Sequence, residues 1–224
     1  MNAYLQPLIQ AFEKAANAEE AAYMEAYMKG HFKFYGMKTA VRREIQKEFL
    51  KEYGLPAVET LEALVFDAYQ SAYREVHAFA REVSVKLKKQ WPEHFIELFE
   101  WMIVHNSWWD SVDSISVDLV ANYFKKYPAQ MQSLTTKWSV HENMWLRRTS
   151  IIFQVLNKDK TNTALLAANI EPNLNSKEFF IQKAIGWALR QYGKTNPNWV
   201  VEYVNSHDLK PLSKREAMRI IIKK

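Results

Sequence analysis

The sequence of 224 residues contains no cysteine, which excludes a disulfide framework, a thiol nucleophile and any cysteine-ligated zinc or iron–sulfur site. No apolar run approaches the roughly 18 residues of a membrane span. Residues 1–15 lack the basic and unbroken apolar regions of a signal peptide. These absences predict a protein of a reducing compartment, the bacterial cytoplasm or nucleoid, with no membrane partner.

Glycine and proline are also scarce, with five and seven residues, and leave little chain for flexible linkers. We therefore expect one domain that covers residues 1–224. Positive charge and aromatic side chains are abundant instead: the formal net charge is +5, and eight tryptophans contribute to an aromatic content of 14%. The charge favours an anionic partner.

The common catalytic signatures are missing as well. The sequence has no glycine-rich phosphate loop, no histidine pair at metal spacing and no serine, histidine and aspartate pattern that stands out. We interpret the six scattered histidines as structural or surface residues. Neither a metal nor an organic cofactor is expected.

Apolar residues recur at intervals of three and four along almost the whole chain, which predicts an all-α fold. The first expected helices cover residues 4–15 and 18–28, and the next begins at Lys38 and Thr39. From there, prolines expected to open helices recur every 36 residues, and aromatic residues just inside the following helices keep nearly the same interval. The prolines are Pro56, Pro92 and Pro128, with Pro197 restoring the series, and the aromatic residues are Tyr73, Trp109, Trp145 and Phe180.

A period of this length indicates a superhelical array of two-helix repeats, an α-solenoid. In such an array the second helices line up along one side, typically the concave side. That geometry is expected to bring Trp109, Asp113, Arg147 and Arg148 to one surface together with the helix expected at 176–192.

Residues 106–114 place two adjacent tryptophans and two carboxylates at the start of a helix. At about 100° per residue, Trp108 and Val112 share an apolar stripe, whereas Trp109 and Asp113 share a different face. Trp108 is therefore expected in the core. For Trp109 and Asp113 two interpretations remain open here: a second packed aromatic beside a solvated acid, or a functional pair.

Arg148 lies on the apolar side of the helix expected at 143–156, and Arg147 lies on its polar side. A charge on an apolar face needs a partner or lines a functional groove. Asp110 and Asp113, one repeat earlier, are the candidate partners of Arg148.

Basic residues surround a tryptophan on one face of the helix expected at 176–192. That face is either solvated or a nucleic-acid surface, on which cations bind phosphates and the ring packs on a sugar or base. Its members are Lys183, Trp187, Arg190 and Lys194. Further cations lie near the two ends, at Lys38, Arg42 and Arg43 and at Lys214, Arg215, Arg219, Lys223 and Lys224.

Several stretches closely resemble the AlkD-type DNA alkylation repair glycosylases, and the resemblance covers essentially the whole chain. The most specific are Trp-Trp-Asp-Ser-Val-Asp at 108–113 and Phe-Phe-Ile-Gln-Lys-Ala-Ile-Gly-Trp at 179–187. Residues 36–43, 145–148 and 211–217 also match. The chain departs from the family pattern at Lys38, Ala40 and Leu156, where contacts with DNA and not the chemistry are expected to change.

The resemblance implies a HEAT-like superhelix whose basic concave face holds duplex DNA. It implies a monofunctional, monomeric glycosylase that hydrolyses the N-glycosidic bond of cationic N3- and N7-alkylated purines, such as 3-methyladenine and 7-methylguanine, and leaves an abasic site. The lesion need not be flipped into a pocket, unlike in most glycosylases. No metal or cofactor is required.

The same resemblance assigns roles to individual residues. Asp113 would be the catalytic carboxylate, Trp109 and Trp187 would contact the backbone and sugar of the lesion nucleotide, and Arg148 would lie in the same cleft. Near the opposite strand or along the backbone, the DNA-binding candidates are Tyr27, Lys38, Thr39, Arg43, Arg147, Lys183, Arg190 and Lys194.

Two other functions are compatible with a helical repeat array: a non-catalytic HEAT-like protein that binds DNA structures, and an RNA or protein scaffold. A pure DNA binder gains nothing from a carboxylate that faces phosphates. Scaffolds usually repeat their recognition residues in every unit, whereas here the corresponding residues differ from unit to unit. Both features favour one localised site and a repair glycosylase.

Overall fold

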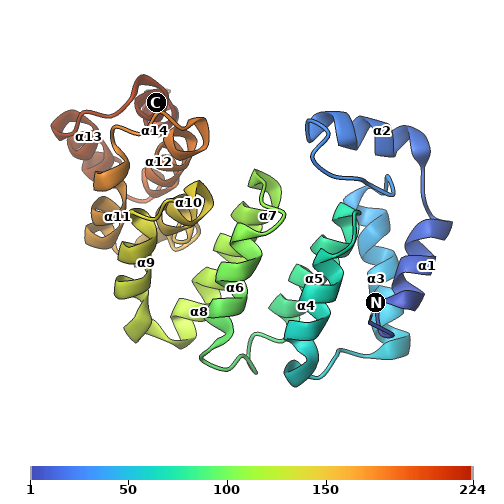
Figure 1. The fold of residues 1–224 in the computed structure, drawn as a ribbon. Helices are drawn as coiled ribbons and strands as arrows, with labels where there is room; N and C mark the ends of the chain where they lie inside the picture. The colour runs from blue at the N-terminus through green and yellow to red at the C-terminus, as the bar shows by residue number, and fades with distance from the viewer. Residues whose placement is uncertain (1, 223–224) are drawn as a thin grey trace. The chain divides into compact units, whose positions relative to one another are not determined.

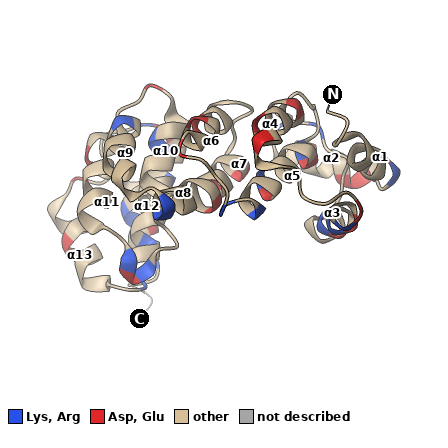
Figure 2. Ribbon diagram, turned by 90° about the horizontal axis from the view of Figure 1, so that it is seen from below, with Lys and Arg blue, Asp and Glu red and all other residues tan. Residues whose placement is uncertain are grey.

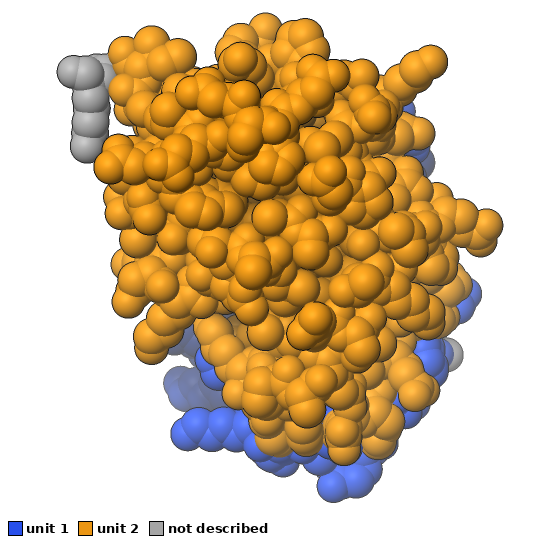
Figure 3. Space-filling view, turned by 90° about the vertical axis from the view of Figure 1, so that its left-hand side faces the viewer, with its two compact units in different colours: residues 1–92 blue, residues 93–224 orange. Residues whose placement is uncertain are grey.

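The computed structural model describes residues 2–222, so Lys223 and Lys224 of the expected C-terminal cations lie outside the described residues. The chain forms two compact units, Met1–Pro92 and Glu93–Lys224 (Figure 3). Both are built from helices, and the extended pairing among the described residues is limited to one isolated bridge between Lys33 and Tyr73. The predicted all-α fold and helical repeat architecture are confirmed (Figure 1). Within residues 2–222, no helix is long and apolar enough to cross a membrane.

The first unit consists of helix pairs in which α1 packs on α3 and α4 packs on α5. Its core is formed by side chains such as Phe12, Leu64 and Phe79, all at most 1% exposed. The helix α2 buries none of its side chains fully. The helices are α1 (Gln6–Lys14), α2 (Ala18–Tyr27), α3 (Thr39–Tyr53), the 3-10 turn η1 (Val58–Thr60), α4 (Leu61–Tyr69) and α5 (Arg74–Lys86).

The loop before α3 is held by a buried carboxylate. Glu75 accepts hydrogen bonds from the backbone N–H groups of Tyr35, Gly36 and Met37 at 3.1, 3.0 and 3.4 Å. Gly36 has φ +86°, and a Cβ there would lie 2.1 Å from the carbonyl oxygen of Asn17. Only glycine fits this close approach, and the loop thereby fixes where α3 begins.

The second unit continues the pairing of helices, with a core that joins α10, α11, α12, α13 and α14. It includes Ile151, Ile181 and Leu189, which are fully buried. The elements are α6 (Phe95–Val104), α7 (Trp109–Ser114), the π-helical segment η2 (Ile115–Val120), α8 (Ala121–Lys126), η3 (Pro128–Gln130), α9 (Met131–Ser139), α10 (Met144–Ile152), η4 (Lys158–Lys160), α11 (Thr163–Ile170), η5 (Glu171–Asn173), α12 (Phe179–Tyr192), α13 (Pro197–Ser206) and α14 (Pro211–Met218).

The prolines mark the repeats, but they open α-helices less directly than predicted. Pro197 is the first residue of α13, as expected. Pro128 instead begins the 3-10 turn η3, and Pro56 and Pro92 precede α4 and α6 by a few residues. A tighter 3-10 turn is a common way to enter a helix, because the first N–H groups need no intrahelical partner.

The expected helix at 176–192 begins at Phe179, three residues late. The N–H of Glu178 donates to the hydroxyl oxygen of Ser176 at 3.3 Å, which favours a turn over a first helical turn. The expected start at Lys38 and Thr39 is confirmed, since α3 begins at Thr39.

Candidate active site

Asp113 lies in α7, the short helix that begins directly after Trp108. Val112, its neighbour, is fully buried and fixes the rotation of the helix. From Ile115 the helix continues in π-helical form. Such segments are rare and frequent at functional sites. There the hydroxyl of Ser116 donates to the carbonyl oxygen of Val112 at 2.7 Å, and its oxygen lies 2.9 Å from the hydroxyl oxygen of Thr149, a second hydrogen bond that ties η2 to α10.

The predicted partnership of Arg148 is confirmed, and the partner is Asp113. Nε of Arg148 donates to Oδ1 at 2.7 Å and Nη2 donates to Oδ2 at 2.8 Å, a two-pronged ion pair. Nη1 donates to the carbonyl oxygen of Phe180 at 2.5 Å. The guanidinium of Arg148, whose side chain is 5% exposed, therefore links α7, α10 and α12, which belong to three successive repeats.

Burial raises the pKa of the Asp113 carboxyl above its ordinary value, and the hydrogen bonds and charge of Arg148 oppose that rise. The side chain is 20% exposed, so solvent or substrate can still reach it. Each carboxylate oxygen accepts one hydrogen bond from Arg148 and retains capacity for another. The pair thus presents a fixed carboxylate that can still bind a water molecule.

Three aromatic rings pack together, and one of them, Phe180, lies beside this ion pair. Trp108 lies 5.3 Å from Phe180 and 6.0 Å from Trp145, and Trp145 lies 5.1 Å from Phe180, measured between ring centroids. The guanidinium carbon of Arg148 lies 5.9 Å from the Phe180 ring. Trp145 is buried, whereas Trp108, which was expected in the core, is only partly buried, as is Trp109, the first residue of α7.

Phe180 was not predicted as a site residue. The sequence marked it as one of the aromatic residues that keep the repeat period and as part of the matching stretch 179–187, without a role of its own. Its ring packs beside the guanidinium, and its carbonyl oxygen accepts from Arg148. The signal that could have identified it is its equivalence in the repeat to Trp109 and Trp145.

On α12, Trp187 is partly buried against the C-terminal core. Lys183 and Arg190 lie one turn to either side of it, but both pair with Glu216 of α14. Lys194 is exposed. Two cations of the expected basic face therefore pair with a carboxylate of the neighbouring helix α14, a partner that was not predicted.

Arg147, expected on the DNA surface, is partly exposed. Its Nη1 donates to the carbonyl oxygens of His141 and Glu142 at 2.6 and 2.8 Å. These bonds close the turn before α10, and the remaining N–H groups of the guanidinium retain donor capacity.

The remaining DNA-binding candidates belong to the first unit. Tyr27, at the end of α2, is 62% exposed, and Thr39, the first residue of α3, is exposed. Lys38 lies 3.1 Å from Glu20 in an exposed ion pair. Arg43, 65% exposed, lies 3.3 Å from Glu82.

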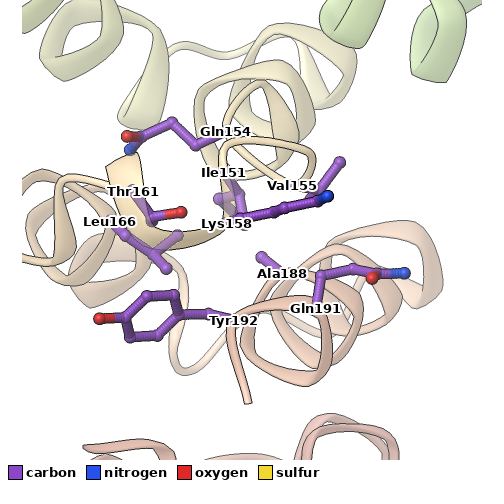
Figure 4. A pocket seen from close by; sticks show the side chains of 9 residues that line it. All are labelled: Ile151, Gln154, Val155, Lys158, Thr161, Leu166, Ala188, Gln191 and Tyr192. Carbon is purple, nitrogen blue, oxygen red and sulfur yellow. The ribbon is translucent and has the colours of Figure 1, made fainter. Parts of the chain in front are cut away.

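A small pocket opens between the end of α10 and α12 (Figure 4). Its volume is about 10 Å³, enough for roughly one water molecule and far too little for a nucleobase. Ile151, Val155, Ala188 and Tyr192 form its apolar wall, while Gln154, Lys158 and Thr161 add polar groups. This pocket is therefore not the candidate site, and Asp113 is not among the residues that line it. Among residues 2–222, no group of three histidine, aspartate or glutamate side chains could hold a metal ion.

A helical repeat protein with a fixed, partly accessible carboxylate among aromatic rings is the class that the fold and this site define. The chain belongs to the family of DNA alkylation repair enzymes, whose model matches residues 8–221. Among solved structures it is similar to a predicted DNA alkylation repair enzyme from Enterococcus faecalis, with 34% sequence identity and a TM-score of 0.86. The match covers 93% of this chain and 98% of that one. No curated protein matches the chain.

Proposed function

We propose that this protein is a DNA glycosylase that hydrolyses the N-glycosidic bond of cationic N3- and N7-alkylated purines in duplex DNA. The observation that carries the proposal is the ion pair between Asp113 and Arg148, which holds a partly accessible carboxylate in one orientation. Membership of the DNA alkylation repair enzyme family supports the choice of substrate.

The chemistry follows from the charge of the lesion. An alkyl group at N3 or N7 makes the purine a cation, so the base leaves as a neutral molecule when the bond from C1′ to N9 breaks with its electron pair. No general acid is needed for that step. The sugar that remains develops positive charge at C1′ and O4′, and a nearby carboxylate stabilises it electrostatically.

Asp113 then orients the attacking water and accepts its proton as the oxygen bonds to C1′. Arg148 favours the ionised form of the carboxylate against the effect of burial and fixes both of its oxygens. Because the carboxylate is already oriented, no protein group has to reorient as positive charge develops on the sugar.

Trp109 and Trp187 supply the aromatic surfaces of the proposed site. A π face attracts positive charge, and each such contact contributes on the order of 0.5–2 kcal/mol where water is excluded. Both side chains are partly exposed, as a surface contact with the lesion nucleotide requires. Tyr27, Thr39 and Arg43 of the first unit are proposed to contact the opposite strand.

Base release from duplex DNA treated with a methylating agent tests this function, with a chelator present to exclude metal-dependent contaminants. The wild type should release 7-methylguanine or 3-methyladenine. Asp113→Asn should slow release by about 10²–10³-fold, the scale of losing one preorganised electrostatic or acid–base group. Its DNA affinity should stay similar or rise, because a negative charge beside phosphates is removed.

Asp118→Asn is the matched control, since Asp118 is exposed and lies five residues further along the same helical stretch. It should retain full activity. No release by the wild type excludes the glycosylase, and full activity of Asp113→Asn excludes the assigned carboxylate. Thermal melts of all three proteins separate loss of chemistry from loss of folding.

A further inference from the structure

Glu216 contacts both cations that flank Trp187 on α12. Its Oε1 lies 3.0 Å from Nζ of Lys183, and its Oε2 accepts from Nη1 of Arg190. The carboxylate is 11% exposed at the side chain, while Lys183 and Arg190 are 36% and 20% exposed. Lys183 is thus the most accessible of the three charges, Arg190 is partly accessible and Glu216 is nearly covered.

This arrangement depends on an unusually close approach of two helices. A Cβ at Gly186 would lie 2.4 Å from Cβ of Glu216 and 3.0 Å from the carbonyl oxygen of Ser213. Ser213 also donates from its hydroxyl to the carbonyl oxygen of Gln182 at 3.0 Å. The glycine lets α14 lie against α12, and this contact places the carboxylate between Lys183 and Arg190.

Glu216 is ionised at neutral pH. The hydrogen bond from Lys183 lowers the pKa of its carboxyl, burial opposes that effect, and the charges of Lys183 and Arg190 lower the pKa further. The cluster of two cations and one anion therefore carries a net charge of +1 and not +2. The ammonium and guanidinium still have N–H donors beyond those that the carboxylate uses.

The other charged residues on and just after α14 are basic. Lys214 and Arg215 on α14, and Arg219 just after it, are exposed. Figure 2 shows lysine and arginine residues in blue on α12 and the ribbon beside it. Glu216 is the acid within this basic segment, and it is directed inward to α12. A surface that serves only to bind phosphate as tightly as possible would not place an anion between its two cations.

We infer that Glu216 is an internal counter-anion that limits the affinity of α12 for DNA phosphates and holds Lys183 and Arg190 on either side of Trp187. This inference rests on the proposed function, because it requires α12 to face DNA. A phosphate that approaches α12 must share the two cations with the carboxylate or displace it. Undamaged DNA is then bound weakly, so the protein dissociates from sites where Trp187 does not contact a lesion.

Binding of a fluorescent, undamaged duplex to the full-length protein at several salt concentrations tests the inference. Glu216→Gln should bind about 3–10-fold more tightly at low salt. Its plot of log affinity against log salt should be steeper by about 0.9, the value for one additional phosphate contact. Glu202→Gln is the matched control, because it removes the same charge from an exposed position on α13 in the same unit.

A double variant tests whether the higher DNA affinity of Glu216→Gln comes from Lys183, which no longer pairs with a carboxylate. Adding Lys183→Gln to Glu216→Gln should return the affinity and the salt slope to near the wild-type values. If Glu216→Gln melts too low to be measured, Glu216→Asp replaces it: the shorter side chain keeps the charge but cannot span both cations, and affinity should rise by a smaller factor.

Two results would overturn the inference: equal binding by Glu216→Gln and Glu202→Gln, or weaker binding by Glu216→Gln with an unchanged melting temperature. Neither result would contradict the proposed glycosylase activity. A wild type that binds no DNA would overturn the proposed function and this inference together. A wild type that binds DNA but releases no base, with the Glu216 effect intact, would exclude the chemistry and support the counter-anion.

Discussion

Replacing Arg148 by methionine is the most direct test of what holds the site together. The substitution keeps much of the apolar stem and removes the guanidinium, so Asp113 loses both hydrogen bonds, at 2.7 and 2.8 Å. The carbonyl oxygen of Phe180 loses its donor as well. Removing one partner of a buried ion pair costs about 3–5 kcal/mol, because the other charge is left without compensation.

Asp113 is 20% exposed, so some water reaches it, and a loss of about 3 kcal/mol is expected at pH 8. The loss should shrink as pH falls. Burial already raises the pKa of Asp113, and without Arg148 the native-state value rises further. A carboxyl whose native pKa lies above its unfolded value destabilises the fold when ionised, and that cost disappears as the pH falls below the native pKa.

At pH 5 the loss should therefore be about 1–2 kcal/mol, mostly packing and the lost hydrogen bond to Phe180. Urea unfolding followed by tryptophan fluorescence suits the measurement, because all tryptophans except Trp91 lie in the second unit and report on its unfolding. Arg147→Met is the matched control: the neighbouring guanidinium bonds backbone carbonyls, so its smaller loss should not change with pH. A loss for Arg148→Met that is equal at pH 5 and pH 8 would refute the charge pairing as its cause.

Two further predictions concern stability. Gly186→Ala should destabilise the protein by about 1–2 kcal/mol despite the better helix propensity of alanine, because its Cβ would lie 2.4 Å from Cβ of Glu216. Gly193→Ala is the control, because the nearest contacts of a Cβ there are at 3.3 Å. It should be nearly neutral in the same urea titration. Glu82→Gln should cost about 3 kcal/mol at pH 7, because it leaves the buried guanidinium of Arg42 without its anion. Although burial opposes the shift, Arg42 lowers the pKa of Glu82, so its stabilisation is present above the ordinary value of 4.5 and is lost as pH falls through the lower native value. Melts followed by circular dichroism should therefore show wild type and Glu82→Gln converging in acid, and a constant difference would contradict this account.

Apolar periodicity in the sequence predicted the helices, and it also predicted one long-range contact, because it placed Arg148 on the apolar face of its helix. An arginine among apolar residues cannot remain unpaired, and a repeat period places an aspartate of the preceding unit beside it. Arg148 and Asp113 are 35 residues apart and meet as that reasoning requires. The outer edges of helices were less predictable: α12 begins at Phe179 because a local side-chain bond at Ser176 competes with the first turn.

Glu216 could not be predicted in the same way, because its environment depends on how closely two helices approach. In the sequence it is one acid in the basic segment 210–219, where a solvated position is the ordinary expectation. Only the contact at Gly186 brings its carboxylate between Lys183 and Arg190. Helical periodicity identifies the face of a helix on which a charge lies, but it does not show that a neighbouring helix has already neutralised that charge.

Asp113 and Glu216, both in the second unit, therefore have opposite relations to their cations. Arg148 is nearly inaccessible, and its charge serves to keep Asp113 ionised and oriented. Lys183 remains accessible, and the charge of Glu216 reduces what it can offer to phosphate. In the glycosylase that we propose, the first arrangement supplies the chemistry at a lesion and the second keeps binding elsewhere weak. Asp113→Asn should consequently impair base release without weakening DNA binding, and Glu216→Gln should strengthen binding to undamaged DNA, so the two effects can be measured separately.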